Sequence, residues 1–402
     1  MEILHVFNDD KFIDPAIKLI ESVYPNSSLY FIIQSNESPF KYVKSPLGKP
    51  LILKGSEDEI NFVKFIHDNK IKVVFFHALD FKKQHLVNLL KDEILKVWFI
   101  WGYDLYYNWP LFKKNIFEKE TKKYLNINFN TKEKIIYNTF SLFLFKNLYK
   151  LENVLPNKII RILKNKYDTA FYKAVKKIDI VVPVVPTEYK LVRKIDDNNV
   201  YGPFTYGCIE DILNDKINDN VLDARNILIG NSGDPSNNHL DIFKKLNELG
   251  IHDRKIIVPL SYAGSKDYIA HVIEIGKRYF GENFIPLVNF MPLKEYNQLV
   301  SSCGFVVFNH VRQQAVANII AMSYMGAKIF LNEKSPVYEY YKSIGINLKG
   351  IKQINKNTLI TNLTLDEFKR NQRILFDIYS RDAVQNKIKI LLNVVNQQIT
   401  SK

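Results

Sequence analysis

NILIGNSGDPSNNHLDIFKKL, residues 226–246, is the most informative stretch of this sequence, because a short apolar run leads through a small polar loop into an amphipathic segment. The run 226–230 is typical of a buried strand. Free N–H groups at the start of a helix form an anion site, and ligands of open α/β sheets bind at the carboxyl ends of strands. The loop predicts a phosphate site at Asn231, Ser232 and Gly233, unless a polar side chain merely caps the helix. The motif is neither GxGxxG nor a Walker loop, so a generic dinucleotide or ATP site is not indicated.

A second strand–loop–helix segment, NHVRQQAVANIIAMSYMGAKIFLN at 309–332, carries further candidate contacts. Arg312, Gln313 and Gln314 stand where its loop passes into the helix. Arginine can hold a phosphate through two parallel hydrogen bonds, and amide side chains can bind phosphate or sugar hydroxyls. These residue types predict a ligand-binding junction; the alternative is an ordinary exposed helix start.

Apolar runs alternate with longer amphipathic stretches along most of the chain, which is typical of α/β layers. In the first half we expect strands at 3–7, 29–33, 50–54, 72–78, 96–102 and 178–186. In the second half we expect strands at 226–230, 254–262, 284–288, 304–309 and 327–332. This order predicts an α/β fold with two facing Rossmann-like domains, a cleft between them and a C-terminal helix.

The expected domain bounds follow changes in composition along the chain. Residues 1–207 form an N-terminal Rossmann-like domain that contains a basic helical insertion at 111–177. Residues 208–224 are expected to be a linker, residues 225–364 a second Rossmann-like domain, and residues 365–402 C-terminal helices.

One polar cluster is expected in the first half, beside an aromatic-rich strand end. Asp104 follows a strand and is flanked by Trp101 and Tyr103, which suits a sugar site with a general base. His5 and Asp10 lie at the end of the first strand, on the sheet edge where His77 should emerge. The alternatives are that Asp104 caps a turn and that each histidine is a satisfied core residue.

The net charge of the 402-residue chain is +14, and most of it lies in one region. Residues 111–177 hold sixteen Lys or Arg against five Asp or Glu, a net charge of +11. A uniform codon bias would not concentrate charge in this way. Aromatic and aliphatic residues are interleaved with the lysines, so an anionic membrane is the expected partner. Ordinary packing helices with solvated lysines and a nucleic-acid surface are the alternatives.

Several classes of protein are excluded by what the sequence lacks. Only two cysteines occur, and CxxC and HExxH motifs are missing, so neither a disulfide scaffold nor a zinc site is indicated. We expect no metal cofactor. No apolar run reaches the length of a membrane span, and the start of the chain shows no targeting segment.

Several motifs together resemble one enzyme family. ILIGNSGDPSNNH (227–239), IIVPLSYAG (256–264), RQQ (312–314) and FLNEKSP (330–336) are similar to those of TDP-N-acetylfucosamine:lipid II N-acetylfucosaminyltransferases, glycosyltransferase family 56. The first half agrees in FFH (75–77) and WFIWGYDLY (98–106). Phe99, Tyr103, Ala78 and the long basic region depart from the family pattern, and all lie in the half expected to bind the acceptor.

The resemblance implies a GT-B fold with the donor nucleotide bound by the second domain and the acceptor by the first. It adds Tyr262 and Asn332 to the donor-binding residues, and it places His77, Trp101 and Tyr103 with the acceptor. Asp104 is expected to be the general base, with Asp10 and His5 next in order.

The implied reaction moves a deoxy-amino sugar from a TDP-sugar to an undecaprenyl-diphosphate-linked saccharide, as in enterobacterial common antigen-like polysaccharide synthesis. Such an enzyme would be peripheral, at the cytoplasmic face of the bacterial inner membrane. Another nucleotide sugar or acceptor, a sugar-nucleotide epimerase and a non-enzymatic binding module remain alternatives.

Overall fold

The computed structural model describes residues 2–113, 115–127, 135–136, 138–214, 217 and 219–402. The chain divides into two compact units. Unit 1 comprises Met1–Lys114, Phe129–Gly207 and Val384–Lys402; unit 2 comprises Asn115–Asn128 and Cys208–Ala383. Each unit is built on its own sheet.

The sheet of unit 1 is parallel and has the strand order β3-β2-β1-β4-β5-β6-β7. The first six strands in this series follow the order of a Rossmann fold, which reverses between β1 and β4. Its strands are β1 (Ile3–Asn8), β2 (Ser28–Gln34), β3 (Gly48–Ile52), β4 (Val73–His77), β5 (Leu95–Phe99), β6 (Ile180–Val182) and β7 (Val200–Tyr201). β4 and β5 are buried along their whole length, as expected for strands covered on both faces.

Amphipathic helices cover this sheet. In α1 (Ile13–Val23), Ile13, Ala16, Ile17 and Ile20 recur at helical spacing and are buried. The other described helices of unit 1 are α2 (Ser56–Asp68), α3 (Phe81–Leu89), α4 (Tyr103–Tyr106), α5 (Pro110–Lys113), α8 (Thr139–Lys146), α9 (Leu148–Leu151), α10 (Asn157–Tyr167), α11 (Ala170–Lys177), η1 (Pro186–Glu188) and α12 (Tyr189–Ile195).

The sheet of unit 2 repeats the same topology, with all strands parallel in the order β10-β9-β8-β11-β12-β13. The order reverses between β8 and β11. Its strands are β8 (Asn226–Ile229), β9 (Ile256–Pro259), β10 (Phe284–Leu287), β11 (Cys303–Phe308), β12 (Lys328–Leu331) and β13 (Lys349–Gly350). The predicted α/β fold with two Rossmann-like units is confirmed.

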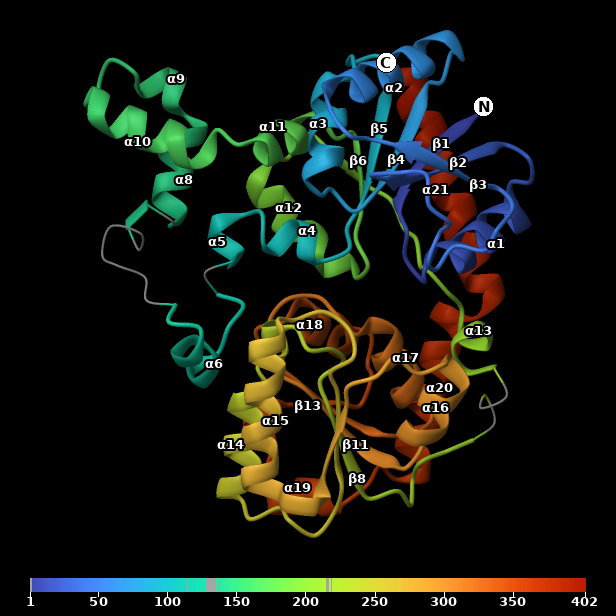
Figure 1. Cartoon of the computed structure of the whole chain (residues 1–402), viewed down its shortest axis with the longest axis vertical. Helices are drawn as coiled ribbons and strands as arrows, with labels where there is room; N and C mark the ends of the chain where they lie inside the picture. The colour runs from blue at the N-terminus through green and yellow to red at the C-terminus, as the bar shows by residue number, and fades with distance from the viewer. Residues whose placement is uncertain (1, 114, 128–134, 137, 215–216, 218) are drawn as a thin grey trace. The chain divides into compact units, whose positions relative to one another are not determined.

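Helices flank the second sheet on both faces, with α14 (His239–Glu248) and α15 (Lys266–Phe280) on one side and α16 (Leu293–Val300), α17 (Val316–Tyr324) and α20 (Leu365–Tyr379) on the other (Figure 1). The core between the sheet and α14 includes Phe243, Phe280 and Phe284. The remaining described elements are α6 (Lys119–Tyr124), α13 (Ile209–Leu213), η3 (Pro235–Asn237), η4 (Gly281–Asn283), α18 (Pro336–Ser343), η5 (Ile351–Gln353), α19 (Lys356–Ile360) and α21 (Arg381–Ser401).

The two units differ from the expected domain bounds: residues 208–224, expected to be a linker, belong to unit 2. Residues 115–127, expected inside the basic insertion of the first domain, pack on unit 2. The C-terminal tail is two helices, since α20 ends at Tyr379 and α21 begins at Arg381. Most of α21 belongs to unit 1. Within the described ranges, no helix combines the length and the apolar character that a membrane-spanning helix needs.

Candidate active site

The polar loop after β8 is held against the loop after β9 by close backbone contact. Gly233 N–H donates to the carbonyl of Tyr262 over 2.8 Å. A Cβ at Gly233 would lie 2.7 Å from the carbonyl oxygen of Ala263, and Gly264 adopts a positive φ of 82°. Only glycine fits so close a crossing of two loops. The Tyr262 side chain is half exposed, at 49%.

Asn237 organises the same loop from within. Its Nδ2 donates to the Ser232 carbonyl over 3.0 Å and to the Ser232 Oγ over 3.1 Å, while its Oδ1 accepts from Asn231 N–H over 3.1 Å. The side chain is buried. Sequence reasoning missed Asn237 as a site residue, although it stands inside the informative motif.

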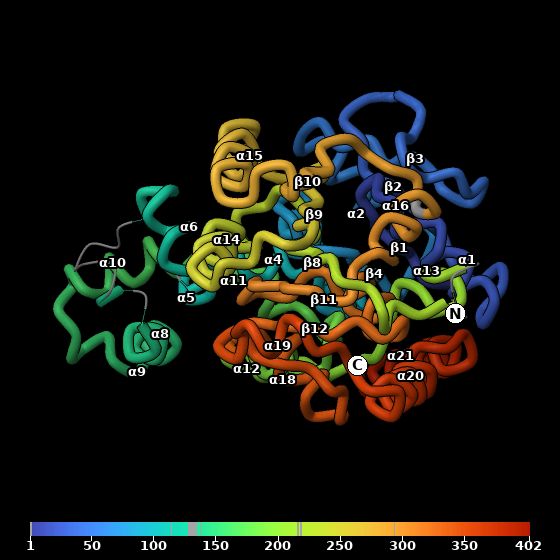
Figure 2. The backbone as a smooth tube through the Cα atoms, turned by 90° about the horizontal axis from the view of Figure 1, so that it is seen from below, coloured from blue at the N-terminus to red at the C-terminus, as the bar shows by residue number. Residues whose placement is uncertain are grey.

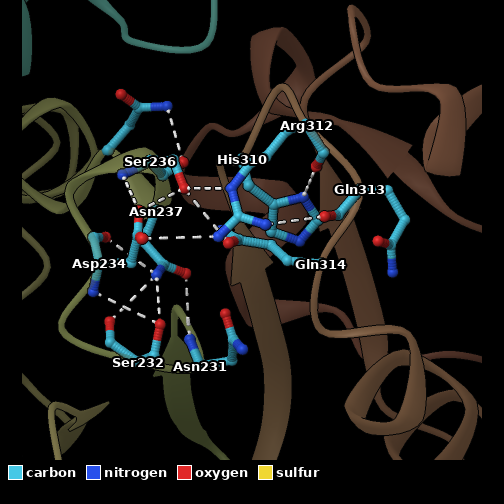
Figure 3. A network of polar contacts seen from close by, with 10 residues as sticks. Asn231, Ser232, Asp234, Ser236, Asn237, His310, Arg312, Gln313 and Gln314 are labelled. Carbon is cyan, nitrogen blue, oxygen red and sulfur yellow. Dashed lines mark hydrogen bonds and ion pairs between the residues drawn. The ribbon is translucent and has the colours of Figure 1, made fainter. Parts of the chain in front are cut away.

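Arg312 joins this loop to the loop after β11 (Figure 3). Its Nε donates to Ser236 Oγ over 2.8 Å, and its Nη1 donates to the Gln313 carbonyl over 3.0 Å. Its Nη2 lies 3.6 Å from Asp234 Oδ2. The structure therefore brings the two predicted loops together at the carboxyl ends of β8 and β11, where the strand order reverses and ligands of such sheets bind.

Several polar atoms in these loops are buried without a hydrogen-bond partner. Among the described residues they include Asn231 Oδ1, His239 Nε2, His310 Nε2, Gln313 Oε1 and Gln314 Nε2. Buried polar groups are normally hydrogen-bonded, so this concentration of unsatisfied atoms is unusual. Gln313 and Gln314 were predicted here; the two histidines were not.

His310 is held as a neutral acceptor. Its Nδ1 donates to the Arg312 carbonyl over 3.0 Å, which leaves Nε2 without a proton. Burial, together with the positive charge of Arg312, lowers the pKa of His310 to about 3. Burial likewise lowers the pKa of His239 to about 4.

Asn332, expected to bind the donor, is already engaged by protein atoms. Its Nδ2 donates to Asn309 Oδ1 over 2.8 Å and to Glu118 Oε1 over 3.0 Å. It lies beyond the carboxyl end of β12, on the same sheet edge as Arg312. In this structure Asn332 therefore links Asn309 to Glu118.

In unit 1, Asp104 is a fully buried acceptor of three hydrogen bonds. Its Oδ2 accepts from Leu79 N–H over 2.8 Å and from Trp98 Nε1 over 2.7 Å, and its Oδ1 accepts from Trp101 N–H over 2.9 Å. Burial raises the pKa of Asp104 above its ordinary value. This geometry matches the alternative that Asp104 fixes a turn, because a substrate hydroxyl cannot reach a carboxylate that is 0% exposed.

His5, His77, Tyr206 and Trp101 form one chain of hydrogen bonds. Trp101 Nε1 can only donate, so it donates to the Tyr206 hydroxyl over 2.6 Å. The Tyr206 hydroxyl is hydrogen-bonded to His77 Nδ1 over 2.6 Å, and His77 Nε2 is hydrogen-bonded to His5 Nδ1 over 3.0 Å. Burial lowers the pKa of both histidines, that of His5 to about 3, so both are neutral.

This chain of hydrogen bonds gives the predicted residues different roles. His5 and His77 are fully buried and act on Trp101 through Tyr206, while Trp101 itself is half-buried. Sequence reasoning missed Tyr206, which lies in the stretch 201–208 (YGPFTYGC). Its aromatic residues between glycines were the available signal.

Asp10 lies in the loop after β1, close to the same aromatic residues. Burial raises the pKa of Tyr206, and the charges of Asp104, Tyr103 and Asp10 raise it further. Two residues on, Phe12 meets Trp101 edge to face, with ring centres 6.2 Å apart. Asp10 and Tyr103 are both half-buried, so the structure gathers Asp10, Trp101 and Tyr103 at one sheet edge.

A buried ion pair adjoins this edge and was not predicted. Lys83 is fully buried and donates to Asp80 and, over 2.8 Å, to Asn8 Oδ1. Asn8 ends β1 and Asp80 follows β4, so the pair ties the two strands at which the order reverses. Among the residues that the structure describes, no three His, Cys, Asp or Glu side chains could hold a metal ion together.

The sequence from 134 to 377 matches the 4-alpha-L-fucosyltransferase family, glycosyl transferase group 56. The match covers more than half of the chain. The chain belongs to this family. It is therefore a glycosyltransferase, and the loops that hold Ser236 and Arg312 both lie inside the matched region of the fucosyltransferase family.

Solved structures share the fold of this family member along its whole length. Sucrose-phosphate synthase from Thermosynechococcus elongatus is 9% identical, with a TM-score of 0.61 and 100% of each chain covered. Anabaena HepE in complex with UDP is 11% identical, with a TM-score of 0.61, over 98% of this chain and 100% of that one. A glycosyltransferase from Rickettsia africae is 10% identical, with a TM-score of 0.59, over 99% and 98%. The fold is thus GT-B.

Proposed function

We propose that this glycosyltransferase moves a deoxy-amino sugar, N-acetylfucosamine or a close relative, from a TDP donor to an undecaprenyl-diphosphate-linked saccharide in surface polysaccharide synthesis. The observation that carries the proposal is the Arg312–Ser236 junction, which stands among unsatisfied polar atoms at the strand reversal of unit 2. The structures of HepE with UDP and with UDP-glucose support a nucleotide sugar as the donor on this fold.

The donor diphosphate is proposed to lie between the loop 231–236 and Arg312. Leaving-group departure places negative charge on the TDP oxygen, and fixed donors aimed at developing charge are the largest electrostatic contribution in many enzymes. Arg312 supplies a positive charge, whereas the N–H groups of Asn231, Gly233 and Ser236 already donate to protein acceptors. The guanidinium can stabilise the leaving group without a metal ion, so we propose a metal-independent reaction.

Asp10 is the proposed general base. Asp104 and His5, the other candidates, are fully buried, whereas Asp10 is half-buried and Phe12, two residues further on, contacts Trp101. A base must reach the acceptor hydroxyl at hydrogen-bond distance. The Trp101 face, fixed through Tyr206, and Tyr103 would then pack against the acceptor sugar. This assignment is for an inverting transfer.

The lipid-linked acceptor is proposed to reach the enzyme at an anionic membrane through helices α8 to α10. Exposed apolar side chains concentrate there: Phe140 (66% exposed), Phe143 (57%), Tyr149 (73%) and Val154 (76%). Between residues 138 and 167 the chain has six Lys or Arg and one acidic residue. Apolar side chains interleaved with uncompensated lysines favour an anionic bilayer surface, and the cytoplasmic face of an inner membrane is such a surface.

A nucleotide panel followed by a transfer assay tests the proposal. TDP, UDP, GDP and CDP are added in turn, and the shift in melting temperature is measured, because a ligand that binds only the folded state stabilises it. TDP should give the largest shift. Transfer from a TDP-deoxy-amino sugar to an undecaprenyl-diphosphate disaccharide in anionic vesicles should then be detected by mass spectrometry. A larger shift with another nucleotide, or no product with the lipid acceptor, would contradict the donor or the acceptor respectively.

A further inference from the structure

Residues 115–127, which we call the strap, belong to unit 2 and donate hydrogen bonds to α14. The carboxylate of Asp241 accepts from Glu120 N–H over 2.8 Å, from Thr121 N–H over 3.1 Å and from Thr121 Oγ1 over 2.8 Å. The strap helix α6 runs beside α14 (Figure 2). One carboxylate thus caps the first turn of α6.

Asn238 connects the strap with both loops of the proposed donor site. Its Nδ2 lies 3.2 Å from the Ile116 carbonyl, 3.2 Å from the Ser236 carbonyl and 2.9 Å from the Asn309 carbonyl. Its Oδ1 accepts from Glu118 N–H over 2.8 Å. The residue is fully buried and has a left-handed φ of 54°. A single amide therefore joins the β8 loop, the β11 loop and the strap.

Glu118 makes a second connection one strand further along the sheet. Its Oε1 accepts from Asn332 Nδ2 over 3.0 Å and from Lys334 Nζ over 2.8 Å. Burial alone would raise the pKa of Glu118, but these two donors outweigh it and the pKa lies below its ordinary value. Since Asn332 also donates to Asn309 Oδ1 over 2.8 Å, Glu118 acts on the β11 loop as well.

These contacts converge on the point where the strand order of unit 2 reverses. Asn238 follows η3, which carries Ser236, and Asn309 begins the loop that carries Arg312. The Arg312–Ser236 junction is therefore braced by strap contacts to both of its loops. The main chain of the strap, rather than another strand or helix of unit 2, makes these additional contacts to Asn238.

We infer that the strap is a positioning element of the donor site, in which Glu118 and Asn238 set the separation of the two loops that hold the donor diphosphate. This inference rests on the proposed function of Arg312. Glu118 does so through Asn332 and Asn309, without itself binding the donor. Hydrogen bonds of this kind contribute to binding by holding donors in place before the ligand arrives.

The strap offers a matched pair of variants for a test. Two glutamates of the strap each form an ion pair. Glu118 pairs with Lys334 beside the proposed donor site, and Glu120 pairs with Lys244 of α14 over 2.8 Å. Glu118→Ala, Glu120→Ala and Arg312→Ala are compared by calorimetric titration with TDP. The Michaelis constants for donor and acceptor are measured for the two strap variants.

Glu118→Ala should weaken TDP binding about five-fold, close to the effect of losing one net hydrogen bond, and raise the Michaelis constant of the donor alone. Glu120→Ala should match the wild type in both. Asn238→Gly, which keeps the left-handed backbone and removes the side-chain bonds, should weaken TDP binding at least as much as Glu118→Ala. It serves as the second variant should Glu118→Ala fold poorly.

The outcomes distinguish a failure of the strap inference from a failure of the proposed donor site. Wild-type TDP affinity in folded Glu118→Ala and Asn238→Gly, with Arg312→Ala impaired, would overturn the strap inference and leave the donor site in place. Unchanged affinity in Arg312→Ala would overturn the proposed donor site itself. Equal losses in Glu118→Ala and Glu120→Ala would show that the strap only stabilises the fold, which also overturns the inference.

Discussion

Arg312 Nε donates to Ser236 Oγ over 2.8 Å, and this bond spans 76 positions of sequence to join the loops after β8 and β11. Ser236 Oγ in turn donates to Asp234 Oδ1 over 2.6 Å. The guanidinium is therefore held by the opposite loop before any ligand arrives. Charged donors fixed in this way lose little further freedom when an anion binds, which is the arrangement expected of a diphosphate site.

Replacing Arg312 by alanine should weaken TDP binding while leaving the fold intact. Losing a charge-assisted hydrogen bond to a phosphate costs about 1.5–3 kcal/mol, or roughly ten-fold to a hundred-fold in affinity. Titration calorimetry measures the loss, and circular dichroism checks the fold. Arg312→Lys, which keeps the charge without the planar fork, should recover only part of it. Unchanged affinity would remove Arg312 from the donor site.

Asp10→Asn and Asp104→Asn should fail in different ways. Asp10→Asn should keep its melting temperature and TDP affinity but lose turnover by ~10²-fold or more, as expected for a general base. Asp104→Asn should lower stability by about 1–3 kcal/mol, because an amide cannot accept on both sides where the carboxylate accepts from Leu79, Trp98 and Trp101. Near-normal turnover in folded Asp10→Asn would exclude Asp10 as the base.

Activity should survive EDTA. The proposed stabilisation of the leaving diphosphate comes from the charge of Arg312, so removing divalent cations should leave initial rates unchanged. The control is a parallel assay with added Mg²⁺ or Mn²⁺. Loss of activity in EDTA that either cation restores would show that a metal takes part.

The α8–α10 region should hold the protein on anionic vesicles. Each Lys or Arg near an anionic leaflet contributes about 1 kcal/mol, an effect that salt weakens. Co-sedimentation with phosphatidylglycerol vesicles should fall for Lys146→Gln/Lys150→Gln and for Phe140→Ser/Phe143→Ser. The matched control, Lys266→Gln/Lys277→Gln, changes exposed lysines of unit 2 and should bind like the wild type. Wild-type protein left in the supernatant at low salt would contradict a membrane surface.

Unfolding should take up protons below neutral pH. His5, His77, His239 and His310 are buried with pKa values well below their ordinary 6.5. They are neutral in the folded state and charge on unfolding, so stability falls as pH drops below about 6.5.

Calorimetry at pH 5.5 in buffers of different ionisation enthalpy measures this proton uptake. His310→Phe should reduce the uptake by about one proton. Equal uptake in wild type and His310→Phe would show that His310 is already charged in the folded protein.

The strands could be predicted because they are short, apolar and separated by amphipathic helices. β4 and β5 are buried throughout, as their mostly apolar sequences predict. The loops after β8 and β11 could be predicted for a similar reason, since parallel strands place their carboxyl ends at one edge. The topology brings these two loops together, but the hydrogen bond from Arg312 to Ser236 was not predicted.

The role of Asp104 could not be read in the same way. A carboxylate between aromatic residues is compatible with a sugar site and with a buried clamp, and only the positions of Leu79, Trp98 and Trp101 distinguish them. The strap was missed for another reason. Its bond from Glu118 to Asn238 spans 120 positions, and no local periodicity reports such a contact.

The course of the chain limits how donor specificity could be transplanted between relatives. Chain segments change unit at 114–115, 128–129, 207–208 and 383–384. A chimera with foreign residues 1–207 and native residues 208–402 would place a foreign strap against the native Asn238 and Asp241. It would also separate α21 from its native neighbours in residues 1–207 of unit 1. Exchange of the donor unit therefore requires 115–128 and 208–383 to travel together as one module.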